Sequence, residues 1–318
     1  MKIILLTNHA AILPAVEHFH SKKWLKAVIS PGKSYSEKPQ IAFLCEELDV
    51  PFYKVQHEDL TTTLHSLFNQ IEPDLALIYG FSYKLPSQVF SIPSIGCFNI
   101  HFSLLPAYAG PDPIFWQIRN GEQMGGITIH RVDENFDSGE IVMQQQMPFI
   151  PGESWGICNS RYSTVVLNML VSLIANLQAD HQLKAQQSRL SKASYFPRPV
   201  IEDLLINWDI ATTEQIENLV NACNPNAGGA ITYLNHQAVR ILEVSPVDGK
   251  GEPGTAPGTI IHADLSGLYV QCLDGNLMRI NILKINEGFI TGFKLVALGV
   301  KKGDCFKSGH YRHQVPCN

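Results

Sequence analysis

The chain has 318 residues, of which 45% are hydrophobic and 17% charged, with a formal net charge of −5 at pH 7. This length and composition fit a globular protein of two domains, each with a core of its own. The seven cysteines lie far apart and form no CxxC pair, so the sequence indicates neither a metal site nor a disulfide framework. A reduced, cytoplasmic protein is the simplest prediction.

The chain opens with a short apolar run, Ile3 to Leu6, that polar residues interrupt from Thr7 onward. A secretory signal has a longer apolar core, so this run is predicted to be a buried first strand. No apolar run approaches the roughly 20 residues that a membrane span requires, so no membrane segment is expected.

Strand-like runs then alternate with helical ones. The predicted strands are Ile3 to Leu6, Ala27 to Ser30, Phe52 to Val55, Leu75 to Tyr79 and Phe98 to Phe102. This rhythm predicts an α/β domain with a mostly parallel, doubly wound, Rossmann-like sheet that helices cover on both faces. The loop after the first strand, residues 6–10, contains no glycine and no GxGxxG motif, which argues against NAD or ATP in that loop.

Two polar residues, Asn99 and His101, alternate with apolar neighbours in the last of these strands. Side chains two residues apart on a strand share a face, so both point the same way. The turn-forming residues from Ser103 to Pro106 end the strand there. A polar pair at the carboxyl end of a strand in an α/β sheet is where ligands usually bind.

A carboxylate is predicted to join this pair. Residues 126–132 are predicted to form another strand, and Asp137, Ser138 and Gly139 a turn before a further apolar run, so the turn can return Asp137 to the pair. These three groups suit transfer of a carbonyl carbon to a nitrogen. Asn99 can donate to the oxygen that gains charge. His101 can exchange protons or, when protonated, share in that stabilisation. Asp137 would raise the imidazole pKa and can accept a proton from the attacking amine.

Each of these residues also has a plainer interpretation. Asn99 or His101 taken alone is more often a satisfied structural group, and Asp137 can simply bond turn amides, as Asx residues commonly do. A further histidine, His130, alternates with apolar neighbours on its predicted strand. We expect His130 to face solvent or to be structural.

Taken together, the segment resembles the methionyl-tRNA formyltransferase-like family, whose members use 10-formyltetrahydrofolate and include amino-sugar N-formyltransferases. The matching signature is Asn99 with His101, then Ser103 to Pro106 as Ser-Leu-Leu-Pro, Gly110, and Asp137 to Gly139. Several spaced elements coincide in order, which makes the signature specific, whereas Asn-x-His alone would be weak.

The resemblance implies catalytic roles for Asn99, His101 and Asp137, with 10-formyltetrahydrofolate as the formyl donor and no metal or NAD. It also implies that the pterin is held largely by backbone groups, at the strand end near Tyr79 and in the loop before the catalytic aspartate. The implied folate-binding residues are Tyr79, Gly80, Phe81, Ser103, Leu104, Leu105, Pro106, Asp133 and Phe136, and the implied acceptor-binding residues are Gly110, Asp112 and Trp116.

Beyond the site, residues 154–177 have the apolar spacing of a helix that packs on the sheet, and residues 188–202 are a polar, proline-containing linker. Thr212 and Gln215 form a capping box ahead of an apolar helical stripe. Five short strands follow: Ala230 to Tyr233, Val239 to Val244, Gly258 to Ile261, Leu268 to Cys272 and Met278 to Ile282, with a hairpin turn at Asp274-Gly275. They suit a small barrel, and the resemblance implies an OB-like one. The predicted domains are therefore 1–187, catalytic, and 203–318, C-terminal.

Charge separates the candidate acceptors. A tRNA enzyme must grip a phosphate backbone through basic clusters. Here acidic residues slightly outnumber Lys plus Arg from Val200 onward, and three lysines between 301 and 307 form the only local cluster. Residues 30–39 correspond to the basic loop of the tRNA enzymes but contain only two lysines and one glutamate, and residues 110–116 look closer to the amino-sugar enzymes. We expect a small amine, such as a nucleotide-linked amino sugar or another metabolite, with methionyl-tRNA as the alternative.

Two other classes stay open. A formyltetrahydrofolate hydrolase would use water in place of the amine and would need no amine pocket. A non-catalytic folate-binding module of the same fold would be expected to lose one of Asn99, His101 or Asp137, and all three are present.

Overall fold

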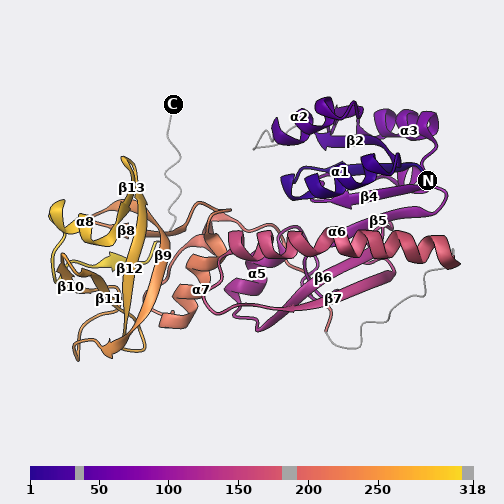
Figure 1. Ribbon diagram of the computed structural model, residues 1–318. Coiled ribbons are helices and arrows are strands. Elements are labelled where there is room, and N and C mark those ends of the chain that lie inside the picture. The colour runs from indigo at the N-terminus through magenta and orange to yellow at the C-terminus, as the bar shows by residue number, and fades with distance from the viewer. Residues whose placement is uncertain (33–38, 181–191, 310–318) are drawn as a thin grey trace. The chain divides into compact units, whose positions relative to one another are not determined.

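The computed structural model describes residues 1–32, 39–180 and 192–309, and the chain divides into two compact units (Figure 1). Unit 1 comprises Met1–Pro113, Met124–Pro148 and Asn159–Pro197, and unit 2 comprises Ile114–Gln123, Phe149–Cys158 and Arg198–Asn318. Two short segments that precede the predicted linker therefore group with the C-terminal unit. Residues 188–191 of that linker, and 33–38 of the loop compared with the tRNA enzymes, lie outside the described residues.

Unit 1 contains a seven-stranded sheet with the order β3-β2-β1-β4-β5-β6-β7. The strands are β1 (Ile3–Thr7), β2 (Leu25–Pro31), β3 (Phe52–Val55), β4 (Leu75–Tyr79), β5 (Gly96–His101), β6 (Met124–Arg131) and β7 (Ile141–Pro148). The first five strands pair in parallel, whereas β6 is antiparallel to β5 and β7 is antiparallel to β6. The predicted Rossmann-like, mostly parallel sheet is confirmed.

Helices cover both faces of this sheet. On one face, α3 (Leu60–Ile71) and α4 (Ser87–Phe90) share a hydrophobic cluster with sheet residues such as Ile4 and Ile78. The side chain of Tyr79, one residue beyond Ile78, points to the opposite face because strand side chains alternate. There its hydroxyl lies 2.9 Å from the hydroxyl of Ser163 on α6 (Trp155–Asp180). The predicted doubly wound arrangement follows from strands that are apolar on both faces.

Helix α6 is long and apolar enough to cross a membrane by length and composition alone. The expectation that no segment reaches that length is therefore wrong by this criterion. Its side chains at Val166, Leu170, Leu173 and Leu177 are nevertheless buried, and their spacing of three or four residues places them on one face. This pattern is that of a core helix on a sheet, as the spacing over residues 154–177 predicts.

Unit 2 contains an antiparallel sheet with the order β10-β11-β12-β9-β8-β14, and β13 pairs with β12. The strands are β8 (Ala230–Leu234), β9 (Gln237–Lys250), β10 (Ile260–Asp264), β11 (Gly267–Gln271), β12 (Asn276–Ile285), β13 (Gly288–Thr291) and β14 (Phe306–Lys307). The two ends of this order meet, because Cys305 before β14 bridges Thr259 before β10. The sheet thus closes into the predicted small barrel, to which the structure adds β13 and β14.

The remaining helices are α1 (Leu13–Ser21), α2 (Pro39–Glu47), α5 (Pro113–Arg119), α7 (Thr213–Cys223) and α8 (Gly292–Ala297), with short 3-10 turns at Ala10–Ile12 and Ile201–Leu204. The predicted capping box begins α7. The hydroxyl of Thr212 accepts from the amide of Gln215 at 3.3 Å, and the Gln215 side chain accepts from the Thr212 amide at 2.9 Å. These bonds satisfy two amides that a helix start leaves unpaired.

Candidate catalytic site

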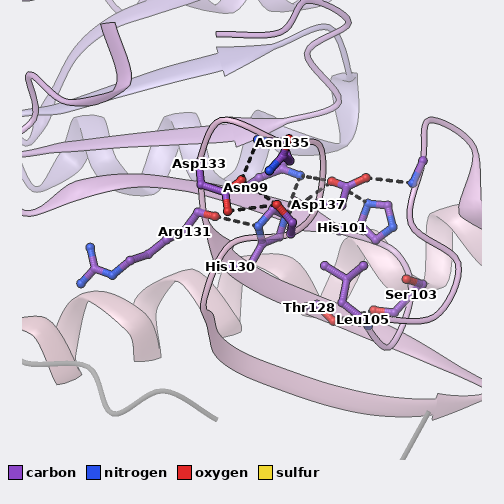
Figure 2. Close-up of polar contacts among 12 residues, drawn as sticks. Asn99, His101, Ser103, Leu105, Thr128, His130, Arg131, Asp133, Asn135 and Asp137 are labelled. Carbon is purple, nitrogen blue, oxygen red and sulfur yellow. Dashed lines mark hydrogen bonds and ion pairs between the residues drawn. The ribbon is translucent and has the colours of Figure 1, made fainter. Parts of the chain in front are cut away.

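The site begins with the register between β5 and β6. Asn99 lies opposite His130, and His101 lies opposite Thr128. Residues directly opposite each other on antiparallel strands have side chains on the same face, so this register alone brings the His130 ring to the Asn99 amide. Asn99 Nδ2 lies 3.1 Å from His130 Nε2 and 3.3 Å from Asp137 Oδ1 (Figure 2).

His130 is a site residue that sequence reasoning missed. The expectation that it faces solvent is wrong, because its side chain is only 3% exposed. Its Nδ1 lies 2.8 Å from the backbone oxygen of Arg131, which can only accept, so Nδ1 carries the hydrogen. In the neutral ring, His130 Nε2 then accepts from the Asn99 amide, and in the protonated ring it can donate to Asp137 Oδ1, 3.5 Å away. Asn99 thus gives one amide hydrogen to His130 and the other to Asp137.

Asp137 reaches the strand pair from the loop that follows β6. Its Oδ1 lies 3.5 Å from Nδ1 of His101 and 3.5 Å from Nε2 of His130, and its Oδ2 accepts from the Gly110 amide at 2.9 Å. Asp133 shapes the loop by accepting from the Asn135 amide at 2.9 Å. The turn therefore places Asp137 beside Asn99 and His101. These are the three residues that the sequence predicts to act together.

Two glycines of the signature permit these close approaches. A Cβ on Gly139 would lie 1.9 Å from the backbone oxygen of Arg131. A Cβ on Gly110, whose φ is +115°, would lie 2.0 Å from the backbone oxygen of Phe196. No larger residue fits either position without movement of the backbone, so both glycines have a steric reason to be there.

Tyr108, in the loop that follows β5, sets the orientation of the His101 ring. Its Nε2 lies 2.9 Å from the backbone oxygen of Tyr108, so Nε2 carries the hydrogen in the neutral ring. The lone pair on Nδ1 then faces Asp137. Only 6% of the His101 side chain is exposed.

Burial sets the charge state of this pair. Burial lowers the pKa of His101 below its ordinary value, and the charge of Asp137 only partly opposes that effect. The sequence prediction that Asp137 raises this pKa is right for the pairwise effect, but the net direction is the reverse because burial outweighs it. Burial also disfavours ionised Asp137, yet His101, His130 and the Gly110 amide hold its pKa at about 2. At neutral pH the site therefore holds a carboxylate beside a neutral imidazole.

Thr128 and Gln144 fix the Ser-Leu-Leu-Pro loop. Thr128 Oγ1 donates to the backbone oxygen of Ser103 at 2.6 Å and accepts from the Leu105 amide at 3.1 Å. Gln144 Nε2 donates to the backbone oxygen of Leu105 at 2.8 Å. The Ser103 hydroxyl is buried and donates to the backbone oxygen of Ala107 at 2.7 Å, so it is no nucleophile. The Leu105-Pro106 peptide is cis, and Leu104 packs over Gly126 of β6.

The residues that the resemblance assigns to folate lie at the end of β4 and in the loops that follow β4, β5 and β6, and the first and last of these loops meet at Lys84 and Phe136. Gly80 follows β4 with a φ of +64°, and Phe81 packs edge-on against Tyr83. Phe136, in the loop before Asp137, is 59% exposed, and Lys84 Nζ lies 5.6 Å from its ring centre. The buried Tyr79 side chain faces α6, so Tyr79 offers only its backbone to this edge. The Asp133 carboxylate is used within its own loop.

The three predicted acceptor residues belong to two different units. Gly110 contacts Asp137 directly, and Asp112 follows it in unit 1, half-buried. Trp116 belongs to unit 2, where it is buried beside the Arg119 guanidinium. No group of three or more His, Cys, Asp or Glu side chains placed to hold a metal occurs in the described parts of the chain.

Residues 8–174 match the family model described as "Formyl transferase", and residues 201–292 match "Formyl transferase, C-terminal domain". The chain is 33% identical over 235 residues to a methionyl-tRNA formyltransferase of Syntrophus aciditrophicus (strain SB), which covers 72% of this chain and 74% of that relative.

Two solved structures share the fold. The N-formyltransferase from Helicobacter canadensis, in complex with folinic acid and dTDP-3-aminofucose, aligns with a TM-score of 0.66 and 18% identity over 88% of this chain and 98% of that chain. HypX from Aquifex aeolicus, in complex with tetrahydrofolic acid, aligns with a TM-score of 0.65 and 17% identity over 98% of this chain. The chain spans about half the length of HypX, 51%. Because the first family model matches more than half of its residues, the chain belongs to the formyl transferase family.

Proposed function

We propose that this protein transfers the formyl group of 10-formyltetrahydrofolate to a primary amine on a small molecule. The observation that carries the proposal is the cluster of Asn99, His101 and Asp137 at the carboxyl end of β5. There the ionised carboxylate of Asp137 lies 3.3 Å from the amide nitrogen of Asn99 and 3.5 Å from Nδ1 of the neutral His101 imidazole. Ligands of open α/β sheets bind at such strand ends.

Each of the three groups has a task in this reaction, for which 10-formyltetrahydrofolate supplies the formyl group as a substrate. Asn99 redirects an amide hydrogen to the oxygen that gains charge as the amine adds to the formyl carbon. His101 Nδ1 accepts the proton that the amine loses and returns it to the departing nitrogen. Asp137 stabilises the imidazolium that exists between these two transfers.

The loops beside the cluster support a folate donor. An exposed aromatic ring, Phe136, stands next to the Lys84 ammonium, and the neighbouring strand end at Gly80 presents backbone groups. A flat heterocycle can stack on such a ring and hydrogen-bond to such a backbone. The Helicobacter and Aquifex proteins of the same fold were crystallised with folinic acid and tetrahydrofolic acid.

The charges of unit 2 support a small acceptor over a polynucleotide. Several of its cations are engaged inside the unit. Arg240 donates to the backbone oxygens of Ala227 and Gly229, Arg279 donates to that of Ser266, and Lys302 pairs with Glu252. The net charge of −5 also opposes tight binding of a phosphate backbone.

A second candidate is formylation of methionyl-tRNA. It is favoured by the curated relatives, since the Syntrophus protein at 33% identity carries that name and spans most of both chains.

An acceptor panel tests the proposal. The full chain is assayed for formyl transfer from 10-formyltetrahydrofolate to nucleotide-linked amino sugars, to other small amines and to charged methionyl-tRNA. His101→Ala serves as the inactive variant, and His65→Ala, an exposed histidine on α3, serves as the matched control. Formylation of a small amine supports the proposal. Efficient formylation of the tRNA alone favours the second candidate, and folate consumption without any acceptor indicates a hydrolase.

A further inference from the structure

A short segment near the end of unit 1, residues 194–196, runs alongside the loop of residues 106–110. We call these the strap and the site loop. The Ser194 amide donates to the backbone oxygen of Pro106 at 3.1 Å, the Ala109 amide donates to that of Ser194 at 3.0 Å, and the Phe196 amide donates to that of Ala109 at 2.9 Å. Ala109 and Tyr195 thus form an isolated parallel β-bridge, which pairs the strap with the site loop.

Two side chains of the strap, those of Ser194 and Phe196, contact the same residue of the site loop, Tyr108. The Ser194 hydroxyl accepts from the Tyr108 amide at 2.9 Å, and the Phe196 ring stacks on the Tyr108 ring with centres 4.9 Å apart and planes 11° from parallel. Tyr108 has a φ of +56°, a conformation that costs a bulky residue free energy. The contacts with the strap offset that cost, so they help to hold Tyr108 in its unusual conformation.

The same site loop contacts both ionisable residues of the catalytic cluster. The backbone oxygen of Tyr108 accepts from His101 Nε2 at 2.9 Å, and the Gly110 amide donates to Asp137 at 2.9 Å. The strap therefore grips Tyr108 by its amide and ring, while the carbonyl of that residue fixes the imidazole. Between the Ser194 hydroxyl and the His101 ring stands a single residue.

We propose that Ser194 is a positioning residue for formyl transfer, which holds Tyr108 so that His101 keeps its hydrogen on Nε2 and turns Nδ1 toward Asp137. This inference rests on the proposed function for its kinetic consequence. It adds a role to the segment that leads into unit 2 at Arg198, since that segment also orients the catalytic imidazole.

The test substitutes Ser194→Ala in the full chain. A small displacement of a catalytic group can cost far more than the lost bond, so kcat should fall about ten-fold, with KM for donor and acceptor within about two-fold. Because the hydrogen bond that His101 donates to the Tyr108 carbonyl raises the pKa of His101, weakening this bond should also move the acidic limb of the pH profile to lower pH. Ser194→Thr keeps the hydroxyl and should restore kcat to within about two-fold. Lys192→Ala, at an exposed neighbour in the chain, is the control and should leave both quantities unchanged.

A second measurement does not depend on turnover. In protein labelled with ¹⁵N in histidine, the ring signals of His101 should show hydrogen on Nε2 in the wild type, and a mixture of tautomers in Ser194→Ala. Phe196→Leu, which removes the ring stacking but keeps the backbone hydrogen bonds between the strap and the site loop, should shift the same signals in the same direction. If the wild type forms no formylated amine, the proposed function fails, while these signals still decide the role of Ser194. Unchanged His101 signals in both variants, or a lower kcat with an unmoved pH limb, would overturn the positioning role.

Discussion

One buried environment holds His101 neutral and Asp137 ionised. Burial keeps the imidazole neutral, whereas hydrogen bonding to the Gly110 amide and the nearby histidines keep the carboxylate ionised, with a pKa of about 2. The carboxylate therefore contributes most when a proton arrives at His101, because an ion pair then forms in a poorly solvated site. This is the condition that a general base needs during addition of an amine.

A pH profile of Asp137→Asn tests this arrangement. Neutral His101 is the active form, so kcat should fall as the pH falls through its pKa, below the ordinary value of 6.5. The charge of Asp137 raises that pKa, so its removal should move the acidic limb to still lower pH and reduce kcat by about 10²-fold. Both enzymes are assayed with the same amine, which makes the ionisation of the acceptor common to them. A limb that stays in place would mean that Asp137 is structural.

His130 offers a second test of the catalytic cluster. In His130→Ala the Arg131 carbonyl loses its donor and one Asn99 amide hydrogen loses its acceptor. Leaving buried groups unsatisfied costs about 1–3 kcal/mol, so urea unfolding should show a stability loss of that order. Misplacement of Asn99 should lower kcat about ten-fold. His130→Gln, which can still present an acceptor to Asn99, should recover part of both losses. Wild-type kinetics in His130→Ala would separate this histidine from the site.

The strands show which part of the site the sequence could predict. Asn99 and His101 follow from local alternation, and Asp137 follows from a turn whose residues are contiguous. Thr128, His130 and Gln144 belong to the same site but depend on the pairing of β5 with β6 and of β6 with β7, whose registers are not encoded in any one strand. The strap was beyond reach for the same reason, since Ser194 and Tyr108 lie 86 residues apart.

Thr128→Val tests how much the Thr128 hydroxyl on β6 contributes to stability through its bonds with the Ser-Leu-Leu-Pro loop and with Gln144 on β7. Valine has nearly the same shape but breaks three bonds of Thr128, those with Ser103, Leu105 and Gln144. Urea denaturation should show a loss of about 2 kcal/mol or more, and kcat should fall as the Ser-Leu-Leu-Pro loop loosens. Thr128→Ser keeps the hydroxyl and should lose only what one methyl group contributes, about 1 kcal/mol. Equal stability of Thr128→Val and Thr128→Ser would show that these bonds do not hold the loop.

At the scale of the whole molecule, composition and periodicity predicted a Rossmann-like sheet and a small barrel, because each follows from regular alternation and turn residues. They did not predict that Ile114–Gln123 and Phe149–Cys158 group with the barrel. That grouping separates Trp116 from Gly110 by unit, although only a few residues lie between them in the chain. Residue spacing alone therefore cannot define the acceptor site.

The dependence of activity on salt tests the small acceptor. If the chain neutralises few phosphates, kcat/KM for the amine should change only modestly between about 50 and about 200 mM salt, whereas a grip on several phosphates would lower affinity by about 10³-fold or more. The measurement is kcat/KM for each accepted substrate across that range. A steep decline for the best acceptor would point to a polynucleotide.

Formyl transfer at the cluster around Asn99 can be measured in a single assay that follows both products. The full chain, with 10-formyltetrahydrofolate and the best amine, is followed for tetrahydrofolate release and for the formylated amine by mass spectrometry, beside folded Asn99→Ala. We predict one formylated amine per tetrahydrofolate released, and a kcat about 10²-fold lower in the variant, as expected when an oxyanion donor is lost. An absence of formylated product from any amine with the wild type, or full activity in Asn99→Ala, would show that this cluster does not carry out formyl transfer.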